Sequence, residues 1–336
     1  MSSVAAGAGS APLLEVDGLC KAFPMKVGKK KQPVNVVEDV SFCVAAGESV
    51  GLVGESGCGK TTVGRTIIGL YGSDGGRVLI DGHEVVKGDE QLVHDTVQMV
   101  FQDPYTSLDP RKTIYDILVE PLKIRKSVPK GEWRGLAAAA VERVGLKQDC
   151  LDRYPFSLSG GQRQRIAIAR ALIMNPPLVI CHEAVSALDV SVQAQVLNML
   201  FELQEETGVA YLFISHDLAV VRHLCTRIVV MYLGRVVEVA ETDELFAAPK
   251  HPYVEALLSA VPVPDPEVAK SRERIMLEGE LPSLTALPAG CIFSTRCPHA
   301  TERCRAERPV LADCGGGHLC ACLRADELEL VGATSA

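Results

Sequence analysis

The sequence of 336 residues lacks long apolar runs: none approaches the ~20 residues that a membrane-spanning helix needs. It also lacks an N-terminal basic segment followed by an apolar core, so no secretory signal is expected. There is no excess of positive charge, and the net charge of −8 gives no whole-chain attraction for nucleic acid or an anionic membrane. We therefore expect a cytoplasmic protein that binds no nucleic acid, in which the one dense basic stretch, 26–31, forms a solvated loop.

Closely spaced C-x₂-C pairs are missing as well, although the chain has 12 cysteines, six of them after position 290. Structural disulfides are not expected in a reducing compartment, so a cluster of cysteines favours a metal or a redox function. Cys291, Cys297, Cys304 and Cys322 are separated by five, six and seventeen residues. Four thiolates suit a [4Fe–4S] cluster or tetrahedral zinc, and the spacing leaves both open, together with metal-free thiols.

The chain contains one phosphate-binding motif of the form G-x-x-x-x-G-K-[ST], at 54–61. An apolar strand expected at 49–53 precedes it, and a helix expected from Lys60 to about Leu70 follows it. Backbone amides at the start of that helix would bind phosphate, Lys60 would reach the terminal phosphates, and Thr61 would ligate Mg²⁺. The residues expected to bind ATP here are Gly54, Ser56, Gly57, Cys58, Gly59, Lys60, Thr61 and Thr62.

Apolar segments that recur between helical stretches predict an α/β fold with a parallel sheet. In chain order these segments lie at 97–101, 178–181, 209–214 and 227–232. A tight turn at Asp81-Gly82 predicts a hairpin within a small antiparallel sheet. The pattern at about 105–171 is helical and predicts an inserted helical subdomain. Prolines become frequent after Phe246, which places a domain boundary near Ala248.

Further motifs follow the phosphate motif in a fixed order. They are Gln102, the signature 158–162 (Leu-Ser-Gly-Gly-Gln), Glu183, 186–189 (Ser-Ala-Leu-Asp) and 215–217 (Ser-His-Asp). With them the chain resembles an ATP-binding-cassette (ABC) ATPase over roughly 12–260. More narrowly, the sequences of 54–60, 101–111 and 251–253 resemble those of the second, F-type ATP-binding subunit of oligopeptide, dipeptide and nickel importers.

This resemblance implies a P-loop NTPase cassette at 12–248, with a RecA-like parallel core, an antiparallel β subdomain and an inserted helical subdomain. A Cys-rich C-terminal extension would occupy 249–336, and some members of the group carry an iron–sulfur cluster there. It further implies a peripheral protein at the cytoplasmic face of the inner membrane that couples ATP to peptide import. The implied partners are a second, different ATPase subunit, two transmembrane permease subunits and an extracytoplasmic solute-binding protein.

The resemblance also implies roles for individual residues. Gln102 would coordinate Mg²⁺ and the attacking water, Glu183 would polarise that water, and His216 would contact the γ-phosphate. Phe23 is either an adenine-stacking residue or a core aromatic. The residues expected to complete the nucleotide site are Ser159, Gly160, Gly161 and Gln162, which would contact the ATP of a partner cassette packed head to tail, together with His182 and Asp189.

His182 departs from the family pattern, because an aspartate normally precedes the glutamate at this point. That aspartate supplies a negative charge and oxygen acceptors beside a hard cation, whereas neutral imidazole offers one acceptor and no charge. We expect weak Mg²⁺ retention and slow hydrolysis at this chain's own phosphate loop. A naturally degenerate site, an introduced substitution and a tolerated change all remain open.

Two other functional classes fit part of the pattern. A soluble ABC protein of translation or DNA repair is disfavoured, because the chain has one phosphate motif, one signature and no long coiled coil. A regulator that senses ATP or redox state without hydrolysis would use His182 and the cysteine-rich tail. Association with membrane subunits and ATP turnover distinguish these classes from a transporter.

Overall fold

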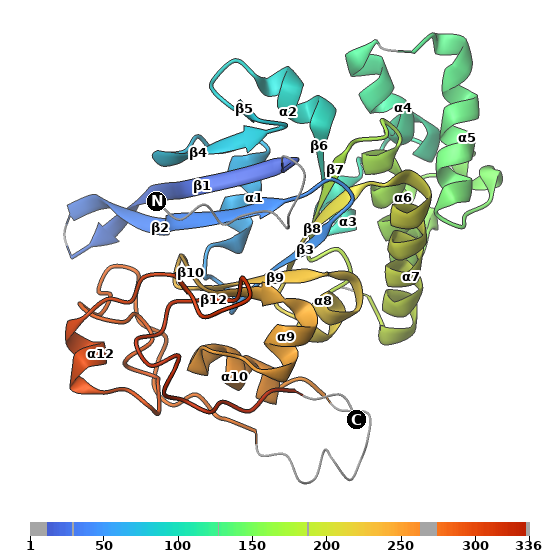
Figure 1. Ribbon diagram of the computed structural model, residues 1–336. Helices are drawn as coiled ribbons and strands as arrows, with labels where there is room; N and C mark the ends of the chain where they lie inside the picture. The colour runs from blue at the N-terminus through green and yellow to red at the C-terminus, as the bar shows by residue number, and fades with distance from the viewer. Residues whose placement is uncertain (1–11, 29, 127, 187, 263–273, 334–336) are drawn as a thin grey trace.

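The computed structural model describes residues 12–28, 30–126, 128–186, 188–262 and 274–333. Its strands form two sheets that lie one above the other (Figure 1). The smaller, antiparallel sheet has the order β2-β1-β4-β5. Its strands are β1 (Leu14–Val27), β2 (Lys30–Val44), β4 (Gly75–Ile80) and β5 (His83–Glu84).

The larger sheet has eight strands in the order β11-β12-β10-β9-β3-β8-β7-β6. Its parallel part consists of β3 (Ser49–Val53), β6 (Val97–Val100), β7 (Leu178–His182), β8 (Ala210–Ser215) and β9 (Arg227–Tyr232). Side chains of these strands are almost entirely buried, as expected where both faces of a sheet are covered. The carboxyl ends of β3, β7 and β8 carry the candidate site.

Helices cover the larger sheet and extend to one side of it (Figure 1). Those that follow β3, β5, β7 and later strands are α1 (Lys60–Ile67), α2 (Glu90–Thr96), α7 (Val190–Thr207), α8 (Leu218–Leu224), α9 (Thr242–Ala247), α10 (Pro252–Ser259) and α12 (Glu302–Ala306). Between β6 and β7 the chain forms α3 (Pro104–Ser107), α4 (Ile114–Arg125), α5 (Trp133–Arg143) and α6 (Gly160–Leu172), with short 3₁₀ helices η1 (Lys130–Glu132), η2 (Gln148–Asp152) and η3 (Pro155–Ser157). No helix within the described ranges is long and apolar enough to cross a membrane.

The first hairpin is longer than the sequence indicates. In the basic stretch 26–31, expected as a loop, Lys26 pairs with Lys31 near the end of the β1–β2 hairpin, and Lys29 lies outside the described residues. Both side chains are exposed, so their charge is solvated as expected, but the backbone is strand. Cross-strand pairing overrides the low strand preference of these lysines.

The C-terminal segment adds strands to the larger sheet. β12 (Leu319–Cys320) pairs antiparallel with β10 (Arg235–Glu241) and with β11 (Ala312–Asp313). Beside this junction the fully buried carboxylate of Glu238 accepts hydrogen bonds from the backbone N–H of Lys250 and His251 and contacts His318 Nε2 at 2.7 Å. The segment is therefore tied to the sheet by backbone pairing and by a buried polar network.

Candidate nucleotide site

The phosphate loop connects β3 to α1 and has a backbone that requires glycine at two places. Gly54 has φ +152°, and a Cβ there would lie 2.2 Å from the carbonyl oxygen of Met231. Gly59 has φ +106°, and its Cβ would lie 2.7 Å from the carbonyl oxygen of Val36. These close approaches let the loop turn back over the start of α1, where free N–H groups and the helix dipole favour an anion.

Lys60 places a positive charge inside this loop. Its side chain is buried, and Nζ donates to the carbonyl oxygens of Gly54 and Glu55 at 2.7 and 2.9 Å. The loop carbonyls thus hold the ammonium among the backbone groups that the motif assigns to phosphate binding. Ser56 and Gly57 are exposed at the outer side of the loop, whereas Cys58 is buried.

His182, at the end of β7, lies against the first turn of α1. Its Nε2 is 2.7 Å from the hydroxyl oxygen of Thr61. Burial lowers the pKa of His182 below its usual value; Glu183 opposes this effect, while the charges of Arg65 and Lys60 add to it. The imidazole is therefore neutral near pH 7 and brings no negative charge to the hydroxyl expected to ligate Mg²⁺.

Gln102 and His182 line the same pocket, which has a volume of about 410 Å³. Gln102 follows β6 and His182 ends the adjacent parallel strand β7, so their side chains meet at one edge of the sheet. Arg65 of α1 also lines this pocket and was not singled out from the sequence. Its position four residues after Thr61, on one face of a helix, is the signal that points to it.

Glu183 and His216 form a second pair beside β7 and β8. His216 Nδ1 lies 3.1 Å from Glu183 Oε1, and both line a pocket of about 100 Å³. Glu183 adopts φ +47°, and its N–H donates to the carbonyl oxygen of Ile214 at 2.8 Å. This unusual backbone is one that proteins keep mostly at functional sites.

The signature residues begin α6. Ser159 and Gln162 form a capping box, with Gln162 N donating to Ser159 Oγ at 3.3 Å and Ser159 N to Gln162 Oε1 at 3.0 Å. A Cβ on Gly161 would lie 2.4 Å from Val192 Cγ1 of α7, while one on Gly160 meets open space. Among the residues described, no hydrogen bond joins this motif to the phosphate loop, so the structure does not bring the two motifs together.

Two further predicted residues have structural partners. Phe23 packs edge-to-face on Tyr71 with ring centroids 5.3 Å apart and is only half-buried, which leaves both interpretations of it open. Asp189 caps α7, accepting from the backbone N–H of Val192 at 3.0 Å. A nucleotide-binding role for either residue stays a prediction.

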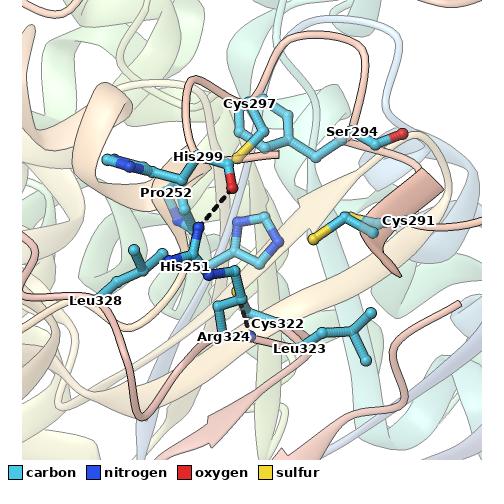
Figure 2. Close-up of a pocket in the computed structure, with 12 residues that line it drawn as sticks. His251, Pro252, Cys291, Ser294, Cys297, His299, Cys322, Leu323, Arg324 and Leu328 are labelled. Atoms are coloured by element: carbon cyan, nitrogen blue, oxygen red, sulfur yellow. Dashed lines mark hydrogen bonds between the residues drawn. The ribbon is translucent and has the colours of Figure 1, made fainter. Parts of the chain in front are cut away.

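The four predicted cysteines Cys291, Cys297, Cys304 and Cys322 line one cavity beside the His251 ring (Figure 2). Burial, with the neighbouring thiols adding, raises the pKa of Cys297 and of Cys322 to about 11, so both are protonated at neutral pH. All are free thiols. In the parts of the chain that the structure describes, however, no three His, Cys, Asp or Glu side chains form a group that could hold a metal ion.

A phosphate loop between a buried parallel strand and a helix, with acidic and polar side chains at the ends of the neighbouring strands, defines a P-loop nucleotide-binding protein. Family models agree with this class. Residues 37–186 match the ABC transporter family, and residues 237–304 match the oligopeptide/dipeptide transporter C-terminal region.

Relatives cover most of the chain. It is 50% identical over 92% of its length to a probable peptide ABC transporter ATP-binding protein, y4tS, of Sinorhizobium fredii, covering 89% of that protein. It is 48% identical over 92% of its length to the oligopeptide transport ATP-binding protein AppF of Bacillus subtilis, covering 96% of that protein. Among solved structures, cbiO1 of Clostridium perfringens, part of the ABC transporter complex cbiONQ, superposes with a TM-score of 0.61 at 25% identity, covering 70% of this chain and 91% of that one.

The chain belongs to the ATP-binding proteins of the ABC transporter family. The α/β cassette fold and the expected likeness to peptide-transport subunits are thereby confirmed. Members of this group are ATPases coupled to transport.

Proposed function

We propose that this chain binds and hydrolyses ATP to drive a membrane importer for peptides or a similar small solute. The observation that carries the proposal is the convergence of Thr61, His182, Gln102, Glu183 and His216 on the carboxyl ends of adjacent strands beside the phosphate loop. The likeness to peptide-transport proteins over 92% of the chain supports the solute class.

The chemistry of the loop fits ATP. Amides of 57–62 and the Lys60 ammonium bind the phosphates, and Glu183, held by His216, orients and deprotonates the attacking water. Mg²⁺ prefers oxygen ligands, and the Thr61 hydroxyl and the Gln102 amide oxygen fit that preference. When bound, the ion would neutralise charge that develops on the phosphate oxygens.

His182 makes this site slower than its geometry otherwise allows. Its neutral ring contacts the Thr61 hydroxyl but adds no negative charge beside it. We propose that hydrolysis at this loop is slow and that the signature, Ser159–Gln162, serves the ATP of a partner cassette. One fully active site in the pair then sustains transport.

The proposed assembly contains a second, different ATPase subunit, two transmembrane permease subunits and a solute-binding protein outside the membrane. This chain would lie at the cytoplasmic face of the membrane. Its cassette would extend over 12–248, with α3 to α6 as the helical subdomain and 249–336 as the C-terminal extension. Pairing of β12 with β10 supports close attachment of the two parts.

The four thiols of the cavity are the donor set that a [4Fe–4S] cluster takes, with zinc as the alternative. Cysteines from positions 291 to 322 converge on one cavity, which supports this assignment, whereas the lack of a metal-binding arrangement among the described side chains opposes it. Measuring the iron, sulfide and zinc content of the anaerobically purified chain would distinguish a [4Fe–4S] cluster from zinc and from metal-free thiols. Metal-free protein with four reactive thiols would overturn the assignment.

The proposed function is tested with the membrane-assembled complex. Replacing Lys60 by Ala should abolish ATP binding at this chain and reduce peptide uptake, while Lys130→Ala, an exposed lysine of η1, should leave both unchanged. Failure of the chain to co-purify with membrane subunits, or peptide uptake that is unchanged in Lys60→Ala, would contradict the proposal.

A further inference from the structure

Glu55, the second residue of the phosphate loop, is held through three of its groups at once. Its carbonyl oxygen accepts from Lys60 Nζ at 2.9 Å, and its backbone N–H donates to Tyr253 Oη at 2.9 Å. Its carboxylate binds Arg296. Two of these partners are 198 and 241 residues further along the chain, so the C-terminal region contacts the loop directly.

The contact with Arg296 has a defined geometry. Arg296 Nη1 and Nη2 lie 2.9 and 3.3 Å from the two carboxylate oxygens of Glu55, and Nη1 lies 3.4 Å from Tyr232 Oη. The Arg296 side chain is 10% exposed and that of Glu55 is 29% exposed. Such a bidentate pair, partly removed from water, fixes orientation as well as charge.

The segment that carries Arg296 is itself firmly placed. Phe293 is fully buried and packs against Tyr232 and Tyr253, with ring centroids 5.3 and 5.5 Å apart. At the start of the segment, a Cβ on Gly290 would lie 2.4 Å from the carbonyl oxygen of Cys304. The guanidinium is therefore presented to the loop from a rigid support rather than from a free side chain.

We propose that Arg296 is a positioning residue of the nucleotide site. Acting through Glu55, it neutralises a carboxylate at the entrance of the phosphate loop, five residues before Lys60, where ATP brings several further negative charges. The inference rests on the proposed ATP binding at this loop. It makes the C-terminal region a part of the nucleotide site, with a role in affinity.

This role of Arg296 predicts that its loss changes the affinity for ATP but not the turnover rate at saturating ATP. Within the described part of the chain, the Arg296 side chain hydrogen-bonds to Glu55 and Tyr232 and to none of the residues assigned to hydrolysis. Its loss leaves a partly buried carboxylate unpaired beside the phosphates, so affinity for ATP should fall. Turnover at saturating ATP should stay within about twofold, because groups that act equally on bound substrate and transition state change KM alone.

The test is a double-mutant cycle on the full-length chain, with binding of a fluorescent ATP analogue as the readout. Arg296→Met should weaken binding by roughly tenfold, since one partner of a partly desolvated ion pair is lost. Glu55→Gln should bind as tightly as the unmodified chain or more tightly. The double variant should recover to within about twofold, because the unpaired charge is gone.

A matched control is Arg303→Met, which removes an exposed arginine of the same region that pairs with Glu307. It should leave binding unchanged. Additive losses in the double variant, or unchanged binding in Arg296→Met, would overturn the inference. If Arg296→Met does not fold, Glu55→Gln decides alone, since tenfold weaker binding in that variant contradicts the neutralising role. Absence of binding by the unmodified chain would instead reject the proposed function.

Discussion

The side chain of His182 replaces a negative charge with a neutral ring at a point 2.7 Å from the Thr61 hydroxyl. Burial keeps the ring uncharged, so the site lacks the carboxylate that a hard cation favours. This single histidine in place of an aspartate should therefore limit hydrolysis more than it limits ATP binding, because Lys60 and the loop amides are unaffected.

Substituting His182 by Asp should therefore raise Mg²⁺-dependent ATP turnover of the assembled complex by roughly tenfold or more, equivalent to about 1.4 kcal/mol of barrier. Steady-state turnover with and without Mg²⁺ measures the effect. His94→Asp, an exposed histidine of α2, adds the same charge elsewhere and should change nothing. Equal turnover for His182→Asp and the unmodified complex would mean that hydrolysis proceeds at the partner's site.

At the scale of the element, α6 begins where α7 passes close to it. Gly161 leaves room for Val192, because a Cβ at Gly161 would lie 2.4 Å from Val192 Cγ1. The signature thus depends on a small residue for its position against α7, as well as on the Ser159–Gln162 capping box.

Gly161→Ala should push α6 away from α7 and lower the free energy of unfolding by about 1–3 kcal/mol, as overpacking typically does. ATP turnover of the complex should fall with it. Adding Val192→Ala makes room for the new methyl group and should restore both quantities in part. Denaturant unfolding of the three variants measures the first effect, and no recovery in the double variant would argue against a steric cause.

The regular elements around the phosphate loop could be predicted because their signals are local. The apolar runs at 49–53, 97–101 and 178–181 correspond to β3, β6 and β7, and the turn at Asp81-Gly82 has the positive φ values that its sequence demands. The full length of β1 and β2 was not predicted, since exposed strands take their stability from pairing with each other.

The site was predictable only in part for the same reason. The family resemblance pointed to Gln102, Glu183 and His216, and the structure places Gln102 beside His182 and Glu183 beside His216. The pairing of Arg296 with Glu55 has no local signal, because 241 residues separate them. Tyr253 lies in a recognised His-Pro-Tyr sequence, but its hydrogen bond to the loop follows from tertiary packing.

At the scale of the whole molecule, His318 links the C-terminal strands to the body of the protein. Its two ring nitrogens contact Glu238 at 2.7 Å and Glu244 at 3.0 Å. Burial works against the charged ring, but these hydrogen bonds outweigh it and raise the pKa of His318. The contribution to stability is therefore complete below the unfolded pKa of about 6.5 and is lost as the pH rises through the higher folded pKa.

We expect β11 and β12 to exchange their amide hydrogens faster as the pH rises above about 6.5, after correction for intrinsic exchange. His251, whose pKa burial lowers to about 3, stays neutral throughout this range and does not contribute. His318→Gln should remove the pH dependence of exchange in these strands, whereas His223→Gln, on α8, should retain it. The same pH dependence in both variants would exclude His318 as its source.

The ion pair between Glu55 and Arg296 has a thermodynamic consequence for the molecule as a whole. Coupling free energies are reciprocal. If the C-terminal region increases the affinity for ATP, bound ATP stabilises that region by the same free energy. Each cycle of nucleotide binding and release would then tighten and loosen the walls of the thiol cavity, whose lining includes Cys297, the residue after Arg296. The supply of ATP in the cell would in this way set how readily oxidants reach those thiols.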